Sequence, residues 1–175
     1  MADLAASIER TGKPRQDRAG STISRIPRDT PPRASFEQER LWFLNKCEPD
    51  SAFYNVPFML RLTGVLDAKA MGRSLEEIVR RHETLRTTFD FRDAQIVQMI
   101  APAMPLALPV EDLSRLPETE RDDRLGALAG VETRRPFDLR QGPQIRCKLF
   151  RLQAEEYVLL PVSYTHLTLP TKRIV

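Results

Sequence analysis

The sequence contains few of the residues from which metal sites, disulfide frameworks and nucleotide-binding loops are built. Its two cysteines, Cys47 and Cys147, lie a hundred positions apart, and no Cys or His stands at metal-ligand spacing from either. The seven glycines are scattered, so a glycine-rich phosphate loop is absent. We therefore expect no metal site and no directly bound cofactor, and we expect both cysteines to be buried small apolar residues.

Long hydrophobic runs are also missing. The stretch from Ala101 to Val110 has ten residues and is broken by three prolines, whereas a membrane-spanning helix needs about 20 apolar residues. Residues 1–10 carry two acids and lack the continuous apolar stretch of a secretory signal. These absences predict a cytoplasmic protein that makes no membrane contact.

Charge of one sign is in excess only near the N-terminus. The chain has 175 residues, of which 41% are hydrophobic and 29% charged, with a net charge of +3; this composition is typical of a globular domain. Residues 1–33 hold seven basic and four acidic residues, so the remainder is neutral. We interpret this leader as a flexible linker, because it lacks aromatic side chains that could stack on bases; a nucleic-acid-binding arm is the alternative.

Hydrophobic periodicity predicts three helices. Ser35 and Gln38 have the spacing of a capping box, and the helix that they begin should end near Cys47. Asp67 is the expected N-cap of a second helix, whose apolar stripe consists of Met71, Leu75, Ile78, Val79 and His82. A third and highly charged helix is expected over residues 117–134, with Pro117 in its first turn.

Alternating apolar residues predict strands between these helices. We expect one strand over residues 56–62, a hairpin from residues 86–91 and 96–100, and two further strands at residues 144–152 and 157–160. Residues 101–110 should be held extended by their prolines. The resulting order predicts an α+β fold in which helices flank a mixed sheet.

Only two histidines are available for acid–base chemistry near neutral pH. His82 lies at a predicted helix end, where an imidazole can bond the last carbonyl groups, so a structural role is favoured over a catalytic one. His166 has no neighbouring carboxylate to orient it. The sequence also lacks a Gly-x-Ser-x-Gly nucleophile elbow. The residue pattern alone therefore predicts no recognisable active site.

Three segments, taken together and in order, resemble the condensation domains of nonribosomal peptide synthetases. They are SFEQERLWFL at residues 35–44, RRHETLRTTF at 80–89 and RPFDLRQGPQIR at 135–146. The resemblance runs from about Ile26 to Leu160, includes the stretch Tyr54-Asn55-Val56-Pro57, and covers only the first part of such a domain. It implies part of one half of a fold like chloramphenicol acetyltransferase, in which two similar halves form a V-shaped pseudo-dimer.

The resemblance also implies a reaction and its partners. In the family, the amine of an aminoacyl thioester attacks an upstream donor thioester, and both substrates arrive on phosphopantetheine arms of peptidyl carrier proteins from adjoining modules. A CoA-dependent acyltransferase, an epimerisation domain and a non-catalytic docking module are the alternatives. Structural roles are expected for eight residues of the three segments: Ser35, Gln38, Arg40, Trp42, His82, Arg86, Phe137 and Asp138. Among them, His82 with Arg86 should organise a helix–strand join, and Arg40 with Trp42 should hold the first helix against the sheet.

The sequence departs from the family at its catalytic motif, His-His-x-x-x-Asp-Gly. The two histidines would fall near Tyr164 and Thr165, followed by the Asp and Gly near Leu169 and Pro170, and none of the four is present. Instead, residues 162–171 resemble a translated transposon-end adapter of sequencing libraries. We therefore expect a flexible basic leader at 1–33, the N-terminal part of a condensation domain at 34–161 and a non-native tail at 162–175. No catalytic residue is assigned, and the fragment is expected to be inactive.

Overall fold

The structure, a computed structural model, describes residues 30–164. Every described element belongs to one compact unit, which begins at Pro31. His166, most of the predicted leader and most of the predicted tail lie outside the described residues. The elements are α2 (Phe36–Cys47), β1 (Asn55–Pro57), β2 (Leu60–Thr63), α3 (Ala68–Arg81), the 3-10 turn η1 (Glu83–Arg86), β3 (Thr87–Arg92), β4 (Gln95–Ile100), β5 (Val110–Asp112), α4 (Glu118–Arg134), β6 (Ile145–Gln153) and β7 (Glu156–Tyr164).

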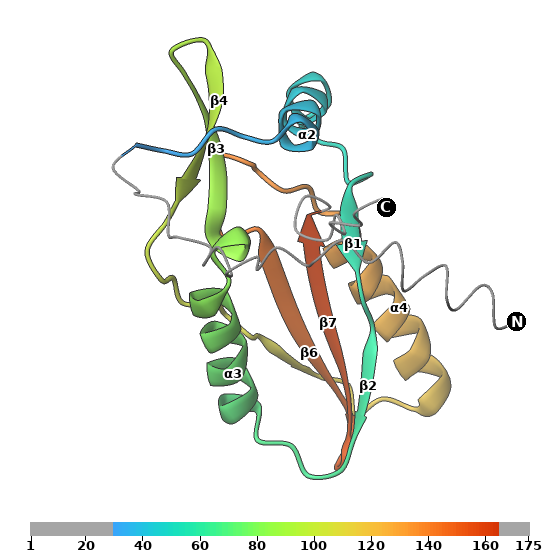
Figure 1. Cartoon of the computed structure of the whole chain (residues 1–175). Helices are drawn as coiled ribbons and strands as arrows, with labels where there is room; N and C mark the ends of the chain where they lie inside the picture. Colours follow the sequence, from blue (N-terminus) through green and yellow to red (C-terminus); the bar gives the residue numbers. More distant parts are fainter. Residues whose placement is uncertain (1–29, 165–175) are drawn as a thin grey trace, which may run out of the picture. The chain divides into compact units, whose positions relative to one another are not determined.

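A five-stranded mixed sheet carries α3 and α4 on its opposite faces (Figure 1). Strand β7 pairs antiparallel with β6 on one side and with β1 and β2 on the other, while β5 pairs parallel with β6. Leu149 of β6 and Leu159 of β7 belong to the same hydrophobic cluster as Leu75 of α3. Phe150, the residue after Leu149 along β6, belongs instead to the cluster that includes Leu128 of α4. This alternation has the period of two that side chains follow along a strand. The predicted α+β layout is confirmed.

Both predicted N-caps are present. The Ser35 hydroxyl accepts from the Gln38 N–H at 3.3 Å, and the Gln38 side chain accepts from the Ser35 N–H at 2.9 Å, which completes a capping box. At the start of α3, the Asp67 carboxylate accepts from the N–H groups of Lys69 and Ala70 at 2.9 and 3.0 Å. These bonds, chiefly that from Ala70, hold the pKa of the Asp67 carboxyl below its usual value. Side chains thus satisfy backbone donors that lack partners within either helix.

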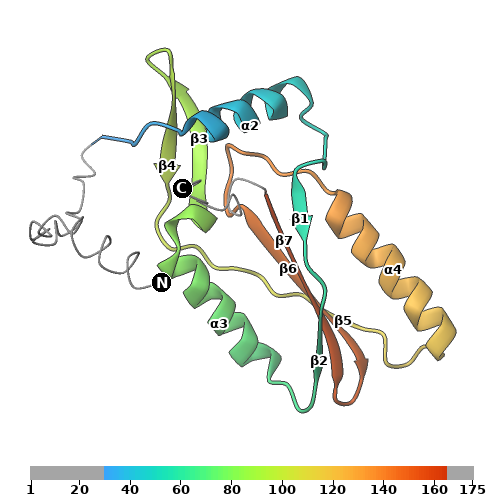
Figure 2. The same cartoon turned by 45° about the vertical axis from the view of Figure 1, so that its right-hand side comes forward.

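Strands β3 and β4 form the predicted hairpin. Its turn residues, Asp93 and Ala94, have φ angles of 48° and 62°, a left-handed pair that matches the twist of a two-residue hairpin. The chain before α2 adds to the edge of β4, because backbone hydrogen bonds of 2.9 and 2.7 Å join residues 32–34 to residues 96–98. Figure 2 shows this segment crossing beside the hairpin. Residues 32 and 33, which were predicted to belong to a flexible leader, are therefore held by backbone pairing.

Several details differ from the predictions. Residues 110–112 form β5, which sequence periodicity misses because three residues are too few to show a period and prolines precede them. The strand predicted over residues 56–62 is divided into β1 and β2. Helix α4 begins after Pro117, which is its N-cap rather than a residue of its first turn.

Cys147 is buried as predicted, but the prediction for Cys47 is wrong, because this residue is exposed at the end of α2. None of the described helices is long and apolar enough to cross a bilayer.

Candidate functional site

The candidate site is the end of strand β7, where the resemblance places the first histidine of the catalytic motif. Tyr164 occupies this position and is 1% exposed. It lies opposite Asn55 of β1 in the sheet register. On the other side, its main-chain N–H donates to the carbonyl oxygen of Gln144 at 3.4 Å. The backbone at position 164 is therefore held by both neighbouring strands.

The Tyr164 ring belongs to an aromatic cluster. Its centroid lies 6.1 Å from that of Tyr54 and 6.3 Å from that of Phe137, and the Phe137 ring meets it edge-on. Such edge-to-face contacts are favourable between aromatic rings. Burial, with a smaller contribution from Tyr54, raises the pKa of the Tyr164 hydroxyl to about 12. Tyr164 is consequently neutral near pH 7.

Two side chains hold the C-terminal end of α4 beside β7. The Asn55 amide Nδ2 donates to the carbonyl oxygens of Thr133 and Arg135 at 2.7 and 2.8 Å. The Arg146 guanidinium donates at 2.6–3.3 Å to three carbonyl oxygens, those of Glu132, Arg135 and Pro136. The last carbonyl groups of a helix have no partner within it, and a cation near them is favoured by the helix dipole. Asn55 and Arg146 therefore fix both the helix end and the loop that follows it.

Arg146 is also fixed from the side of the loop. Its guanidinium carbon lies 3.8 Å from the centroid of the Phe137 ring, a cation–π arrangement. Burial, and next the charge of Arg135, lower the pKa of the Arg146 guanidinium. An arginine side chain nevertheless stays protonated in proteins. Arg146 is thus a partly buried cation whose direct partners in the described chain are carbonyl oxygens and an aromatic face.

Gln144 connects β7 to two of the three signature segments. Its main-chain N–H donates to the Leu85 carbonyl oxygen at 2.9 Å. Its side-chain Nε2 donates to the carbonyl oxygens of Asp138 and Gln141 at 3.0 and 2.9 Å. Gln144 is 0% exposed. We name Asn55, Gln144 and Arg146 the strand-end cluster, because together they hold the end of β7, the end of α4 and the connecting loop.

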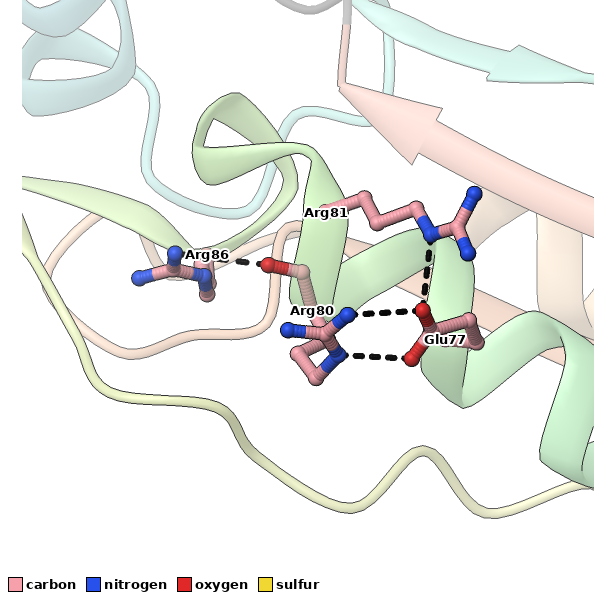
Figure 3. Close-up of polar contacts among 4 residues, drawn as sticks. All are labelled: Glu77, Arg80, Arg81 and Arg86. Atoms are coloured by element: carbon pink, nitrogen blue, oxygen red, sulfur yellow. Dashed lines mark hydrogen bonds and ion pairs between the residues drawn. The ribbon is translucent and has the colours of Figure 1, made fainter.

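The second signature segment forms the end of α3 and the start of β3 (Figure 3). The Glu77 carboxylate accepts two hydrogen bonds from Arg80, at 2.6 and 2.7 Å, and one from Arg81 at 2.7 Å. These bonds, chiefly those from Arg80, lower the pKa of Glu77 to about 2. Arg86 donates to the Arg80 carbonyl oxygen at 3.4 Å and also to that of Ala101, which joins the helix end to the chain after β4.

His82 contributes to this join through its backbone. It is the exposed C-cap of α3, and its N–H donates to the Ile78 carbonyl oxygen at 3.0 Å. Its imidazole makes no capping hydrogen bond to the 3-10 turn that follows. The side-chain contacts predicted for His82 and Arg86 together are therefore supplied by Arg86.

The first signature segment packs α2 on the hairpin. The Trp42 ring stacks on that of Phe91 in β3, with centroids 6.1 Å apart, and packs against the main core. Arg40, which was predicted to help hold this helix against the sheet, is exposed and pairs with Glu37 of its own helix at 3.8 Å. Trp42 thus has the packing role that was predicted for both residues, and its partner ring belongs to the hairpin rather than to the five-stranded sheet.

The third signature segment is the loop between α4 and β6. Phe137 is buried against Tyr164 and Arg146. The Asp138 carboxylate is turned to its own loop, where it accepts from the Arg140 N–H at 2.9 Å. The loop thus inserts an aromatic ring into the core and uses its acid to close a local turn.

A cavity of about 490 Å³ opens between this loop and the chain that precedes β5. Its lining includes Cys147, Arg146 and Asp138. Burial raises the pKa of the Cys147 thiol to about 11, so that it is protonated near neutral pH. Across residues 30–164, His, Cys, Asp and Glu side chains form no group that could hold a metal ion. At this end of the sheet the backbone is held by hydrogen bonds, and a cavity lies beside the loop between α4 and β6.

Comparison with known proteins identifies the family. The profile described as "Condensation domain" matches residues 32–168. The chain belongs to the condensation-domain family. A linear gramicidin synthase of Brevibacillus parabrevis is 42% identical over 149 residues, and chondramide synthase cmdD of Chondromyces crocatus is 42% identical over 127 residues. The alignments cover 85% and 73% of this chain, but only 2% and 3% of those relatives.

Two solved structures share the fold. The starter condensation domain of rhizomide synthetase RzmA matches with a TM-score of 0.70 and 22% identity, over 78% of this chain and 33% of that one. SgcC5 of Streptomyces globisporus matches with a TM-score of 0.58 and 31% identity, over 65% of this chain and 26% of that one. The predicted α+β fold, part of a chloramphenicol-acetyltransferase-like half, is confirmed. The chain corresponds to a fragment of a nonribosomal peptide synthetase condensation domain.

Sequence reasoning missed the strand-end cluster. Asn55 and Arg146 lie within stretches that resemble the family, and Gln144 begins a predicted strand, but no individual role was predicted for any of the three. Two available signals were a glutamine at the start of a predicted strand and an asparagine directly before Val56-Pro57. A buried polar residue requires hydrogen-bond partners, and these signals therefore point to a structural contact even though they do not identify it.

Proposed function

We propose that the intact protein joins two carrier-bound acyl groups through an amide bond. The amine nitrogen of the acceptor aminoacyl thioester bonds to the carbonyl carbon of the donor thioester, and the carbon–sulfur bond breaks. The donor arm leaves as a thiol, whose sulfur takes up the proton lost by the nitrogen. The observation that carries this proposal is the condensation-domain match over residues 32–168.

The geometry supports a scaffold role for this chain within that reaction. When two tethered substrates are brought together in the correct orientation, approximation itself supplies much of the rate enhancement. Such a site needs few reactive side chains but a rigid frame. The strand-end cluster provides one, because it holds β7 through Gln144 and the end of α4 through Asn55 and Arg146.

Its partners, in this proposal, are peptidyl carrier proteins and adjoining synthetase modules in the cytoplasm. This chain matches only 2% and 3% of two relatives that are synthases by name, so each relative has room for many further domains, which supports partners of this kind. Phosphopantetheine would enter as the substrate-bearing arm of a carrier protein and not as a group resident in this chain. We propose that the 175-residue chain alone forms no amide, because its sequence lacks His-His-x-x-x-Asp-Gly.

We also propose that the segment from about Val162 is not native. The support is its resemblance to a translated sequencing adapter. Residues 162–164 continue β7 and pair with β1 and β6, so residues at these positions of the native protein would extend the same strand. The codons for residues 162–171 in the source DNA test this directly. Codons that differ substantially from the adapter would refute it.

A chimera tests the proposed reaction. Residues 34–161 of this chain would replace the matching segment of a condensation domain in the Brevibacillus parabrevis linear gramicidin synthase, which leaves that protein's own catalytic motif in place. We expect the purified chimera to form amide product from loaded carrier proteins, measured by mass spectrometry. A chimera in which the second motif histidine is changed to Ala is the matched negative control. A folded chimera that makes no more product than this control would refute the proposal.

A further inference from the structure

We infer that Gln144 is a positioning residue whose side-chain oxygen accepts a hydrogen bond from the side chain at position 164, and that the native partner there is a short side chain with an N–H donor, such as an imidazole. The inference rests on the proposed function in one respect: it takes position 164 as the first position of the catalytic motif. Its test needs no amide-forming activity.

Gln144 carries an unused acceptor in a fully buried side chain. The residue is 0% exposed, and its Nε2 is committed to the carbonyl oxygens of Asp138 and Gln141 at 3.0 and 2.9 Å. Because these partners can only accept, they identify which end of the amide is the NH₂ group. Oε1 is then the remaining group, and it has no hydrogen-bond partner within residues 30–164. A buried polar atom of this kind requires an explanation in a native protein.

The register of the sheet places Gln144 beside position 164. Strands β6 and β7 pair antiparallel with Ile145 opposite Ser163, so Gln144 is opposite Tyr164. Their backbone hydrogen bond of 3.4 Å agrees with this pairing. Side chains of directly opposite residues lie on the same face of an antiparallel pair, with Cβ atoms about 4.5–5.5 Å apart. The side chain at position 164 is consequently the cross-strand neighbour of Gln144.

Both side chains also face the same loop. Gln144 bonds to the carbonyl oxygens of Asp138 and Gln141, and the ring at position 164 packs on Phe137. An imidazole carries its N–H within the ring itself, whereas tyrosine carries its donor beyond the ring. A histidine at position 164 could therefore present an N–H to Oε1 from close to the backbone, and the acceptor would fix which ring nitrogen carries the proton.

The test introduces that donor and reads it by NMR. Tyr164→His is made in the full 175-residue chain, alone and together with Gln144→Leu, which removes the acceptor. Because the chain holds only two other histidines, the new imidazole is readily assigned from its ¹⁵N–¹H correlations. Gln153→Leu, at the exposed end of β6, is the matched control for loss of a glutamine. In the chimera described above, where the host's own motif histidine occupies position 164, Gln144→Leu and Gln153→Leu are each made alone, in case the isolated chain does not stay folded.

With Gln144 present, we expect the introduced imidazole to populate a single neutral tautomer with one ring N–H protected from solvent exchange. In the Gln144→Leu background, exchange of that N–H should be roughly fivefold faster, as for the loss of one hydrogen bond, and both tautomers should appear. Gln153→Leu should leave the single tautomer unchanged. A folded protein in which the introduced imidazole has the same tautomer ratio and exchange rate with and without Gln144→Leu would overturn the inference. Failure of the chimera to form amides, with this signature intact, would instead count only against the proposed function.

Discussion

Two regions that border strand β7 differ in which side chains they bury: one buries polar groups, and the other leaves hydrophobic side chains exposed. The strand-end cluster buries polar groups and pairs them with backbone carbonyls of α4 and its loop. The other region, which we name the apolar flank, exposes hydrophobic side chains on and beside β1 and β2, with exposed fractions from 48% to 91%; it consists of Phe53, Phe58, Met59, Leu60 and Val65.

The difference separates a region whose buried donors are mostly paired within residues 30–164 from one that leaves apolar side chains uncovered. Buried polar groups stabilise a fold when partners satisfy them, and most donors of the cluster are satisfied by partners within residues 30–164. Exposed hydrophobic side chains, in contrast, are typical of an interaction site or of an aggregation-prone surface when they gather into one patch. We therefore expect substitutions in the cluster to change folding stability, and substitutions in the flank to change association.

The largest effect should come from Arg146→Met. This change removes three hydrogen bonds to carbonyl oxygens and the contact with the Phe137 ring. Each hydrogen bond from a charged donor contributes about 1.5–3 kcal/mol, and the methionine stem regains part of the packing, so we expect a loss of about 3 kcal/mol in the free energy of unfolding. Urea denaturation measures it. Arg124→Met, on the exposed face of α4, is the control, and equal losses in the two variants would contradict the role of Arg146.

Asn55→Ala should have the next largest effect. It removes two short hydrogen bonds to the carbonyl oxygens of Thr133 and Arg135, which predicts a loss of about 1–3 kcal/mol. Asn45→Ala is matched in chemistry but removes a single bond of 3.4 Å to the Phe137 carbonyl oxygen. It should cost less than about 1 kcal/mol. If both asparagines cost the same in urea denaturation, then the position of Asn55 at the strand end has no special importance.

Ser35→Ala tests a cap outside both regions. It removes the hydroxyl that accepts from the Gln38 N–H and should destabilise the chain by about 1 kcal/mol. Ser74→Ala is the opposite case, because the Ser74 hydroxyl lies within α3 and bonds back to the Ala70 carbonyl oxygen. Since alanine is the better helix former, that variant should be neutral or slightly stabilised. Thermal unfolding by circular dichroism distinguishes the two, and a Ser74→Ala loss as large as that of Ser35→Ala would argue against the capping role.

The pH dependence should show a small effect from Glu77. Its pKa is lowered from 4.5 to about 2 in the folded chain, chiefly by hydrogen bonds from Arg80. A carboxyl whose folded pKa is depressed contributes stability above its unfolded pKa and loses it as the pH falls. The contribution should therefore fade between about pH 4.5 and pH 2, and it should be reduced by salt because the pair is exposed. In denaturation titrations Glu77→Gln should flatten this part of the profile; an unchanged profile would mean that the ion pairs contribute nothing.

Substitutions in the apolar flank should leave stability nearly unchanged but alter association. In the double variant Phe58→Ser with Met59→Lys, both side chains are more than half exposed in the parent, so the free energy of unfolding should change by no more than about 0.5 kcal/mol. Sedimentation velocity should show that the parent chain self-associates and that the variant does so less. A monodisperse parent at the same concentration would show that the flank does not need a covering surface.

The parts of the fold that sequence reasoning predicted are those encoded locally. The capping box at Ser35, the Asp67 cap and the hairpin each depend on residues a few positions apart. The strand-end cluster does not, because Asn55 bonds to carbonyl groups 78 and 80 residues away. Spacing along one sequence carries no record of such contacts. The same limit explains Cys47, whose exposure depends on which elements fail to cover the end of α2.

The sequence was enough to predict where along the chain the candidate site lies, but not which residues contact one another there. The resemblance indicated that chemistry should follow β7, and the strand register then placed Gln144 opposite that position. The aromatic contacts of Tyr164 with Tyr54 and Phe137 bring together residues from three distant segments. A single sequence predicts the segments, while their juxtaposition depends on the topology of the sheet.

The most direct test of the account is the rate of amide formation by the chimera when Arg146 is changed to Lys. Lysine keeps the charge but cannot present the planar fork that bonds to several carbonyl groups and stacks on Phe137. If the strand-end cluster fixes the frame for the reaction, the variant should remain folded at about 25 °C yet form amide at about one tenth of the chimera's rate or less, as expected for a frame displaced by a fraction of an ångström. A folded Arg146→Lys chimera with an unchanged rate would contradict the account.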